Sequence, residues 1–241
     1  MLTVSHFSKS YSGGKRAVDD LSFTAPRGTI TGFIGHNGAG KSTTLRCAAG
    51  ILDFSEGEIR IGGHDVRTEP VAAKSITAFL PDNPDLYDFM TGIQYLNFIA
   101  DTYSIPPAER TRRVEKYAGA FDILSVLGSQ IGSYSHGMKQ KLALVSALIR
   151  EPQLLMLDEP FVGLDPQASH VMKGFLREVC DRGGSVLFST HILEVAQKLC
   201  DRIVIIRGGQ LVEEGFTAEV VGNSDLESVF LELAEEGGGD A

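Results

Sequence analysis

The 241-residue sequence predicts an α/β fold with a mostly parallel sheet and a helical subdomain. Three observations support this prediction. Short β-like runs recur toward both ends of the chain, two of the later runs are apolar at almost every position, and the middle has the apolar spacing of helices. We therefore expect residues 1–241 to form a single domain, with the helical subdomain at about 84–150.

The expected strands are short runs rich in β-branched, aromatic or alternating residues. They lie at 2–7, 21–25, 29–34, 58–61, 76–80, 154–157, 186–189, 203–206 and 210–213. The runs LLML (154–157) and VLFS (186–189) are almost continuously apolar, which is typical of parallel strands covered on both faces. These two runs are therefore assigned to a parallel sheet.

Helical spacing dominates from about 91 to 150, where apolar residues stand three and four apart in IQYLNFIADTY, RVEKYAGAFDIL and MKQKLALVSALI. Two further helices are expected at 167–180 and 192–199. The result is an α/β body interrupted by a mostly helical insertion. From 217 to 241 we expect a short tail, in which a helical segment is followed by a frayed GGGDA end.

The charge and the cysteines limit the possible functions. A formal net charge of −9 argues against non-specific nucleic-acid binding, which depends on many Lys and Arg side chains, so no nucleic-acid partner is expected. Cys47, Cys180 and Cys200 lack CxxC spacing and are expected to be buried thiols in a reducing cytosol. We see neither a signal peptide nor an apolar run of about 18 residues, so membrane work would need a partner.

The stretch GHNGAGKS (35–42) fulfils the pattern G-x-x-x-x-G-K-[S/T] between an expected strand and a helix-like stretch. In this P-loop, bare backbone N–H groups can surround a polyphosphate beside the positive end of the following helix. Lys41 would reach the β- and γ-phosphates, and the Ser42 hydroxyl would ligate Mg²⁺. The residues expected to bind nucleotide here are Gly35, His36, Asn37, Gly38, Ala39, Gly40, Lys41, Ser42 and Thr43.

A P-loop alone leaves kinases, GTPases and transport ATPases open. The stretch LLMLDEP (154–160) places Asp158 and Glu159 at the carboxyl end of a buried strand, where ligands bind in open α/β sheets. Asp158 would hold Mg²⁺ through its water shell, and Glu159 would orient or deprotonate the attacking water. The chain is therefore expected to have a P-loop NTPase core.

A third motif, SYSHGMKQK (133–141), begins an amphipathic helix that leads into the strand carrying the two acids. Ser135 is a good N-cap for this helix, and a helix start of this kind can receive an anion. Taken alone, the motif is simply a helix cap.

In order along the chain, GHNGAGKS, YSHGMKQ, LLMLDEP, GLDP (163–166) and STH (189–191) resemble the nucleotide-binding domain of an ABC transporter, over about residues 2–215. The resemblance implies an antiparallel β subdomain beside the mostly parallel sheet. It also implies a head-to-tail dimer that closes over two ATP molecules with Mg²⁺. Ser135 and Gly137 would then contact the γ-phosphate of the ATP bound by a second subunit, identical or different. One chain would supply half of each site.

The same resemblance gives roles to four further residues. Asp165 matches the acid that communicates across the dimer, and His191 matches the switch histidine that contacts the γ-phosphate. Tyr11 matches the aromatic side chain that stacks on adenine. Asp82 stands where the family usually has Gln; we expect it to approach Mg²⁺ through water and to hold the attacking water differently.

The motifs GMKQK and EPFVGLDP are most similar to the ATPase subunits of bacterial exporters of drugs, peptides or antimicrobial compounds. The implied partners are integral membrane subunits, and the implied location is peripheral, on the cytoplasmic face of the membrane. In the family, the region of Leu86, Tyr87, Phe89 and Met90 docks the membrane subunit; these residues could equally be ordinary subdomain core.

Two other classes of function stay open at this point. A soluble ABC ATPase of iron–sulfur cluster assembly is also a single short cassette. A P-loop kinase for a small molecule would give no role to Ser135 or to a second subunit.

Overall fold

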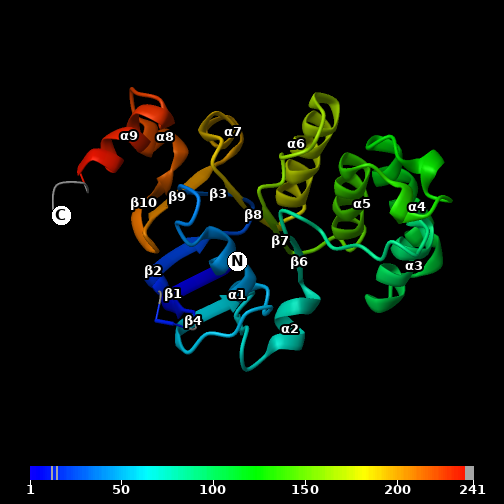
Figure 1. Cartoon of the computed structure of the whole chain (residues 1–241), viewed down its shortest axis with the longest axis horizontal. Coiled ribbons are helices and arrows are strands. Elements are labelled where there is room, and N and C mark those ends of the chain that lie inside the picture. The colour runs from blue at the N-terminus through cyan, green and yellow to red at the C-terminus, as the bar shows by residue number, and fades with distance from the viewer. Residues whose placement is uncertain (12, 15, 237–241) are drawn as a thin grey trace.

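The computed structural model describes residues 1–11, 13–14 and 16–236 (Figure 1). The strands in this part are β1 Leu2–Ser10, β2 Arg16–Ala25, β3 Ile30–Ile34, β4 Glu56–Ile61, β5 His64–Asp65, β6 Thr77–Leu80, β7 Leu154–Asp158, β8 Ser185–Thr190, β9 Arg202–Arg207 and β10 Gln210–Phe216. The helices are α1 Lys41–Ala48, α2 Pro70–Ser75, α3 Gly92–Thr102, α4 Pro107–Ala120, α5 His136–Leu148, α6 Pro166–Asp181, α7 Leu193–Leu199, α8 Thr217–Val221 and α9 Leu226–Glu236, with short 3-10 helices at Leu124–Val126 and Ile131–Ser133.

A six-stranded sheet forms the centre of the molecule in the order β10-β9-β3-β8-β7-β6. Its neighbouring strands are parallel except for β10 and β9. Every residue of β3, β7 and β8 is buried, which explains why apolar side chains dominate these strands, with polar side chains mainly at their ends. The register pairs Ile34 with Thr190 and Asp158 with Ser189, so the three strands end side by side at one edge of the sheet.

A second sheet, in the order β2-β1-β4-β5, is entirely antiparallel and confirms the predicted antiparallel β subdomain. It packs on the central sheet through its apolar face. Phe23 of this sheet stacks on Phe33 of β3 with ring centroids 5.1 Å apart, and Phe7 and Val18 are fully buried in the same cluster. The P-loop strand β3 is therefore held by both sheets.

The helices α3, α4 and α5 lie together at one side of the molecule, on the right in Figure 1, and form the predicted helical subdomain. Thr91 and Gln94 form a reciprocal capping box at the start of α3. Ser135 caps α5 by accepting a hydrogen bond from Met138 N at 3.3 Å, as its sequence position predicts.

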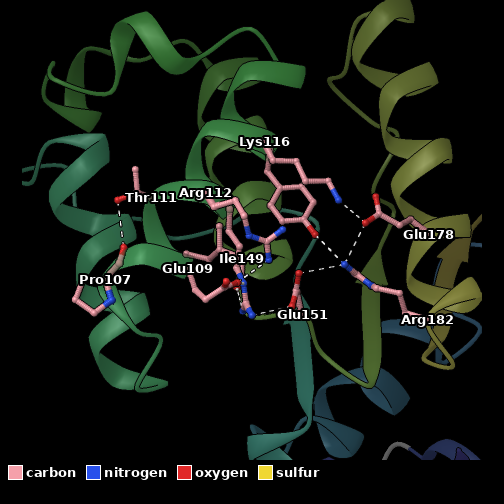
Figure 2. Close-up of polar contacts among 11 residues, drawn as sticks. Pro107, Glu109, Thr111, Arg112, Lys116, Ile149, Glu151, Glu178 and Arg182 are labelled. Carbon is pink, nitrogen blue, oxygen red and sulfur yellow. Dashed lines mark hydrogen bonds and ion pairs between the residues drawn. The ribbon is translucent and has the colours of Figure 1, made fainter.

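A network of ion pairs joins the helical subdomain to the core (Figure 2). Glu151, in the segment between α5 and β7, accepts from Arg113 of α4 at 2.8 Å and from Arg182, which follows α6, at 3.2 Å. Glu178 of α6 pairs with Arg182 at 3.1 Å and with Lys116 of α4. Single exposed pairs contribute only about 0–1 kcal/mol each, so it is the shared network that links α4 to α6.

The expected strands and helices are all present, with ends that differ by a few residues. The two-residue strand β5 and the six-residue helix α2 were missed because segments this short leave no period in the sequence. Residues 217–236 form the two helices α8 and α9, and Leu226 is fully buried in the main core. The expected frayed end, 237–241, lies outside the described residues.

None of the helices in the described ranges is both long enough and apolar enough to cross a membrane.

Candidate functional site

The P-loop connects the carboxyl end of β3 to the first turn of α1. Gly38 and Gly40 have φ values of +83° and +106°, in the left-handed region that favours glycine. A Cβ on Gly35 would come 2.5 Å from the carbonyl oxygen of Ile206, which is closer than any side chain tolerates. The loop therefore needs glycine at these positions for backbone conformation and for packing.

A cavity of about 500 Å³ opens beside this loop. It is lined by residues from the P-loop, the start of α1, the antiparallel sheet and the carboxyl ends of β6, β7 and β9: Tyr11, Arg16, Ala17, Asn37, Gly38, Gly40, Lys41, Ser42, Thr43, Asp82, Glu159 and Gly208. Nine of these twelve residues are among those expected to bind nucleotide or to act on it. The structure thus brings most of the predicted site together.

Lys41 is almost buried at the floor of the site, with 6% of its side chain exposed. Its ammonium group donates to the carbonyl oxygens of Gly35 at 2.6 Å and His36 at 3.3 Å, and lies 3.8 Å from Glu159 Oε1. Burial lowers the pKa of Lys41, while the charges of Glu159 and Asp158 oppose this shift. The positive charge is therefore held in place by groups that an anionic ligand could replace.

The two acids at the end of β7 have different environments. Asp158 is buried, and its Oδ1 accepts a hydrogen bond from Ser189 Oγ at 2.5 Å. The same hydroxyl accepts from Glu159 N at 3.0 Å, and Glu159 N also donates to the Ser189 carbonyl at 3.2 Å. Ser189, in the quoted STH stretch, thus fixes the position of both acids from the neighbouring strand.

The backbone and the side chain of Glu159 both suit it to act on a water molecule. Its backbone lies in the left-handed region with φ of +47°, a conformation that costs a non-glycine residue about 1–3 kcal/mol. Its Oε1 lies 3.0 Å from Nδ1 of His191, while its Oε2 is buried without a hydrogen-bond partner among the described residues. This unpaired oxygen belongs to a residue of the cavity wall, so it can accept a proton or a hydrogen bond from a water molecule there.

Two further predicted residues lie at the rim of the cavity. The Tyr11 hydroxyl and Thr43 Oγ1 are 3.0 Å apart, and part of the tyrosine ring remains exposed for stacking. Asp82 follows β6 and lines the same cavity as Glu159.

Ser135, Gly137 and Asp165 do not line this cavity. Ser135 is exposed at the start of α5, and Gly137 packs against the loop before α6, where an added Cβ would lie 3.3 Å from the Gly163 carbonyl. Asp165 caps α6 and pairs with Lys141 at 2.8 Å. The hydrogen bond from Lys141 lowers the pKa of Asp165. These three residues form a separate surface built from α5 and the start of α6.

Sequence reasoning missed Arg16, Ala17 and Gly208 as parts of the cavity wall. The pair Gly208–Gly209 is recognisable as a turn between two strands, but the sequence gives no sign that it reaches the P-loop. In the structure, Gly209 N donates to the Ala39 carbonyl at 3.0 Å.

The residues in and beside the cavity are of the kinds that ATP and Mg²⁺ require. Within the ranges that the structure describes, no three His, Cys, Asp or Glu side chains are grouped as a metal cage. Mg²⁺ generally takes one or two protein oxygens together with phosphate oxygens and water. Ser42 on the cavity wall and the buried carboxylate of Asp158 fit this need, and the glycine-rich loop with the ammonium group of Lys41 fits a polyphosphate.

The similar proteins found by comparison of sequence and of structure include ATP-binding proteins of ABC transporters. The family model described as "ABC transporter" matches residues 18–162, and a model described as "AAA domain, putative AbiEii toxin, Type IV TA system" matches 129–196. The chain is 32% identical to the ABC transporter ATP-binding protein NatA of Bacillus subtilis (strain 168), over 96% of this chain and 97% of the relative. It is 32% identical to the daunorubicin resistance ATP-binding protein DrrA3 of Streptomyces coeruleorubidus, over 98% of this chain and 74% of the relative. A solved structure described as the ATP binding subunit of an ABC transporter superposes with a TM-score of 0.92 at 33% identity, covering 97% of this chain and 99% of the other.

Proposed function

Because the chain belongs to the ABC transporter family as an ATP-binding subunit, we propose that it hydrolyses ATP to drive transport, most simply export, through separate membrane subunits. The observation that carries the proposal is the single cavity in which the P-loop, Lys41 and Glu159 meet. Such a site places a phosphate-binding loop beside a carboxylate that can act on water.

Binding of ATP follows from the shape of the loop. Residues Gly35 to Thr43 would offer backbone amides and hydroxyls to the phosphates, and Lys41 would exchange its carbonyl partners for phosphate oxygens. Tyr11 stacks on adenine from the antiparallel sheet. The exchange is favourable because the bound anion pairs with a charge that is already largely desolvated.

Hydrolysis needs a positioned water and control of charge. Ser42 and Asp158 would hold Mg²⁺, which would neutralise part of the phosphate charge. Glu159 accepts a hydrogen bond or a proton from the attacking water through Oε2, while His191 fixes Oε1 and reaches toward the γ-phosphate. Asp82 faces this water from the other wall of the cavity.

The remaining predicted residues point to a dimer. Ser135 and Gly137 lie outside the cavity of their own chain, on the exposed start of α5. We assign them to the γ-phosphate of ATP bound by a second ABC subunit, so that ATP draws the two subunits together and hydrolysis lets them part. Asp165, beside this surface, carries the signal across the dimer.

Export and the membrane partner have separate support. The relative DrrA3 is named for daunorubicin resistance, which favours an exporter that acts on drug-like or antimicrobial cargo. We place the chain at the cytoplasmic face of the membrane, bound to integral membrane subunits. The match to transporter subunits favours a transporter over an ATPase of iron–sulfur cluster assembly, and a kinase would leave the surface around Ser135 unexplained.

The docking surface is proposed at α3 and the segment before it. Tyr87 contacts Phe89, Phe98 and Tyr95 with ring centroids 5.8, 6.0 and 6.1 Å apart, and Phe89 is 77% exposed. Of the other residues named for docking, Leu86 is buried in the core and Met90 packs against it. The exposed aromatic group of Tyr87, Phe89 and Phe98 is therefore the part available to a partner.

Affinity purification of the tagged chain from detergent-solubilised membranes tests this proposal. We expect mass spectrometry to identify integral membrane proteins with several predicted spans, and we expect Phe89→Asp to reduce their recovery about 10-fold or more, because a charge would be buried in the contact. Leu211→Asp on β10, at the opposite side of the molecule in Figure 1, is the matched control and should leave the recovery unchanged. Recovery of soluble proteins only, or equal recovery by both variants, would contradict the docking assignment.

A further inference from the structure

The C-terminal helix α9 is anchored to the core. Leu226 is fully buried, and Phe230 and Leu233 pack against the same core from one face of the helix, four and seven residues farther along. The start of the helix is fixed because Leu226 N donates to Gln197 Oε1 of α7 at 2.9 Å. The helix is therefore held in a defined position.

The first contact between α9 and the P-loop is direct. The ring of Phe230 lies against the imidazole of His36, with centroids 4.7 Å apart and a tilt of 58° between the planes. His36 is the second residue of the P-loop, and its carbonyl oxygen accepts hydrogen bonds from Lys41 Nζ at 3.3 Å and from Ala39 N at 3.1 Å. Phe230 thus contacts the residue whose backbone helps to hold the loop and its lysine.

The second contact passes through the turn after β9. Arg207 Nη1 donates to the Leu233 carbonyl of α9. The next residue, Gly208, lines the candidate nucleotide cavity, and Gly209 N donates to Ala39 of the P-loop at 3.0 Å. The loop is therefore connected to α9 at two points, directly through His36 and indirectly through Ala39.

From these two contacts we infer that α9 positions the P-loop for phosphate, with Phe230 as a positioning residue that acts through His36. The inference rests on the proposed function, since it takes the cavity to be a nucleotide site. A docked α9 restricts the backbone of the loop that would bind the phosphates, and this lowers the conformational entropy that binding must remove. By linkage, bound nucleotide must stabilise the docked helix to the same extent.

The effect on affinity is measured by titrating the purified chain with Mg-ADP in a calorimeter. We expect Phe230→Ala to weaken ADP binding about 5-fold or more, a typical coupling between sites. Leu231→Ala, a truncation on the exposed side of the same helix, is the matched control and should bind like the wild type. Phe230→Leu keeps apolar volume on the core but loses the ring contact, so it should fold normally and still bind ADP more weakly.

Two further readouts separate positioning from simple stabilisation. In the His36→Ala background, Phe230→Ala should cause no further loss of ADP affinity, because the contact is already absent. In the wild type, ADP should slow hydrogen exchange of the amides at 226–233, and Phe230→Ala should lose this protection. A helix that served stability alone would lower the melting temperature without either effect.

Wild-type ADP affinity in both Phe230→Ala and Phe230→Leu would overturn the inference while leaving the nucleotide site intact. The inference would also be overturned if Phe230→Ala reduced ADP affinity as much in the His36→Ala background as in the wild type. A wild-type chain that binds no ADP would overturn the proposed function, and the inference with it.

Discussion

Replacing Glu159 with glutamine will reduce ATP hydrolysis about 100- to 10,000-fold, the range expected when a general base is removed. Glutamine has the same shape and can still accept a hydrogen bond, but it cannot take a proton from water. The substitution removes the carboxylate charge, which is shared by Oε1 and by the Oε2 atom that has no partner among the described residues. Binding of ATP should survive, because the P-loop and Lys41 are unchanged.

The measurement is phosphate release by the purified variant under saturating Mg-ATP, together with size-exclusion chromatography with and without ATP. We expect slow hydrolysis and an ATP-dependent dimer, since the γ-phosphate is no longer removed. Glu194→Gln, on the exposed start of α7, is the control and should hydrolyse ATP at the wild-type rate. Hydrolysis at an undiminished rate in Glu159→Gln would show that another group activates the water.

Lys41→Ala should abolish tight ATP binding. Its ammonium group is nearly buried and already paired with loop carbonyls and a carboxylate, so little further desolvation is needed when it meets phosphate. Losing one partner of a buried charge pair typically costs about 2–5 kcal/mol, which is a loss of affinity of about 30-fold or more. Fluorescent ATP titration measures this loss.

The control for this variant is Lys198→Ala, which removes an exposed lysine of α7 and should bind ATP normally. Circular dichroism confirms that both variants are folded. If Lys41→Ala bound ATP as tightly as the control, the phosphates would have to lie elsewhere than at the loop.

The fold and much of the site could be predicted because they depend on local sequence. The apolar runs of β7 and β8 are visible as unbroken patterns, and the P-loop is specified by eight consecutive residues. Asp158 and Glu159 follow a buried strand, so their place at the sheet edge follows from parallel topology.

Other features depend on contacts between distant segments and leave no local signal. The left-handed backbone of Glu159 accompanies its hydrogen bonds to Ser189, which lies thirty residues farther along the chain. Gly208 reaches the cavity only because β9 pairs with β3. The segment from 217 was expected to be a short tail, whereas Phe230 of α9 contacts His36 near the other end of the sequence.

The central claim is that ATP is held between the P-loop of one subunit and Ser135 of another, and mixing two variants tests it most directly. In the Glu159→Gln background, a chain with Lys41→Ala lacks its own ATP site, and a chain with Ser135→Glu repels the phosphate held by its partner. Neither chain alone should dimerise with ATP, but their mixture should, because one of the two shared sites is then intact. A mixture that stays monomeric while Glu159→Gln alone dimerises, or a Ser135→Glu chain that dimerises as well as its parent, would contradict the account.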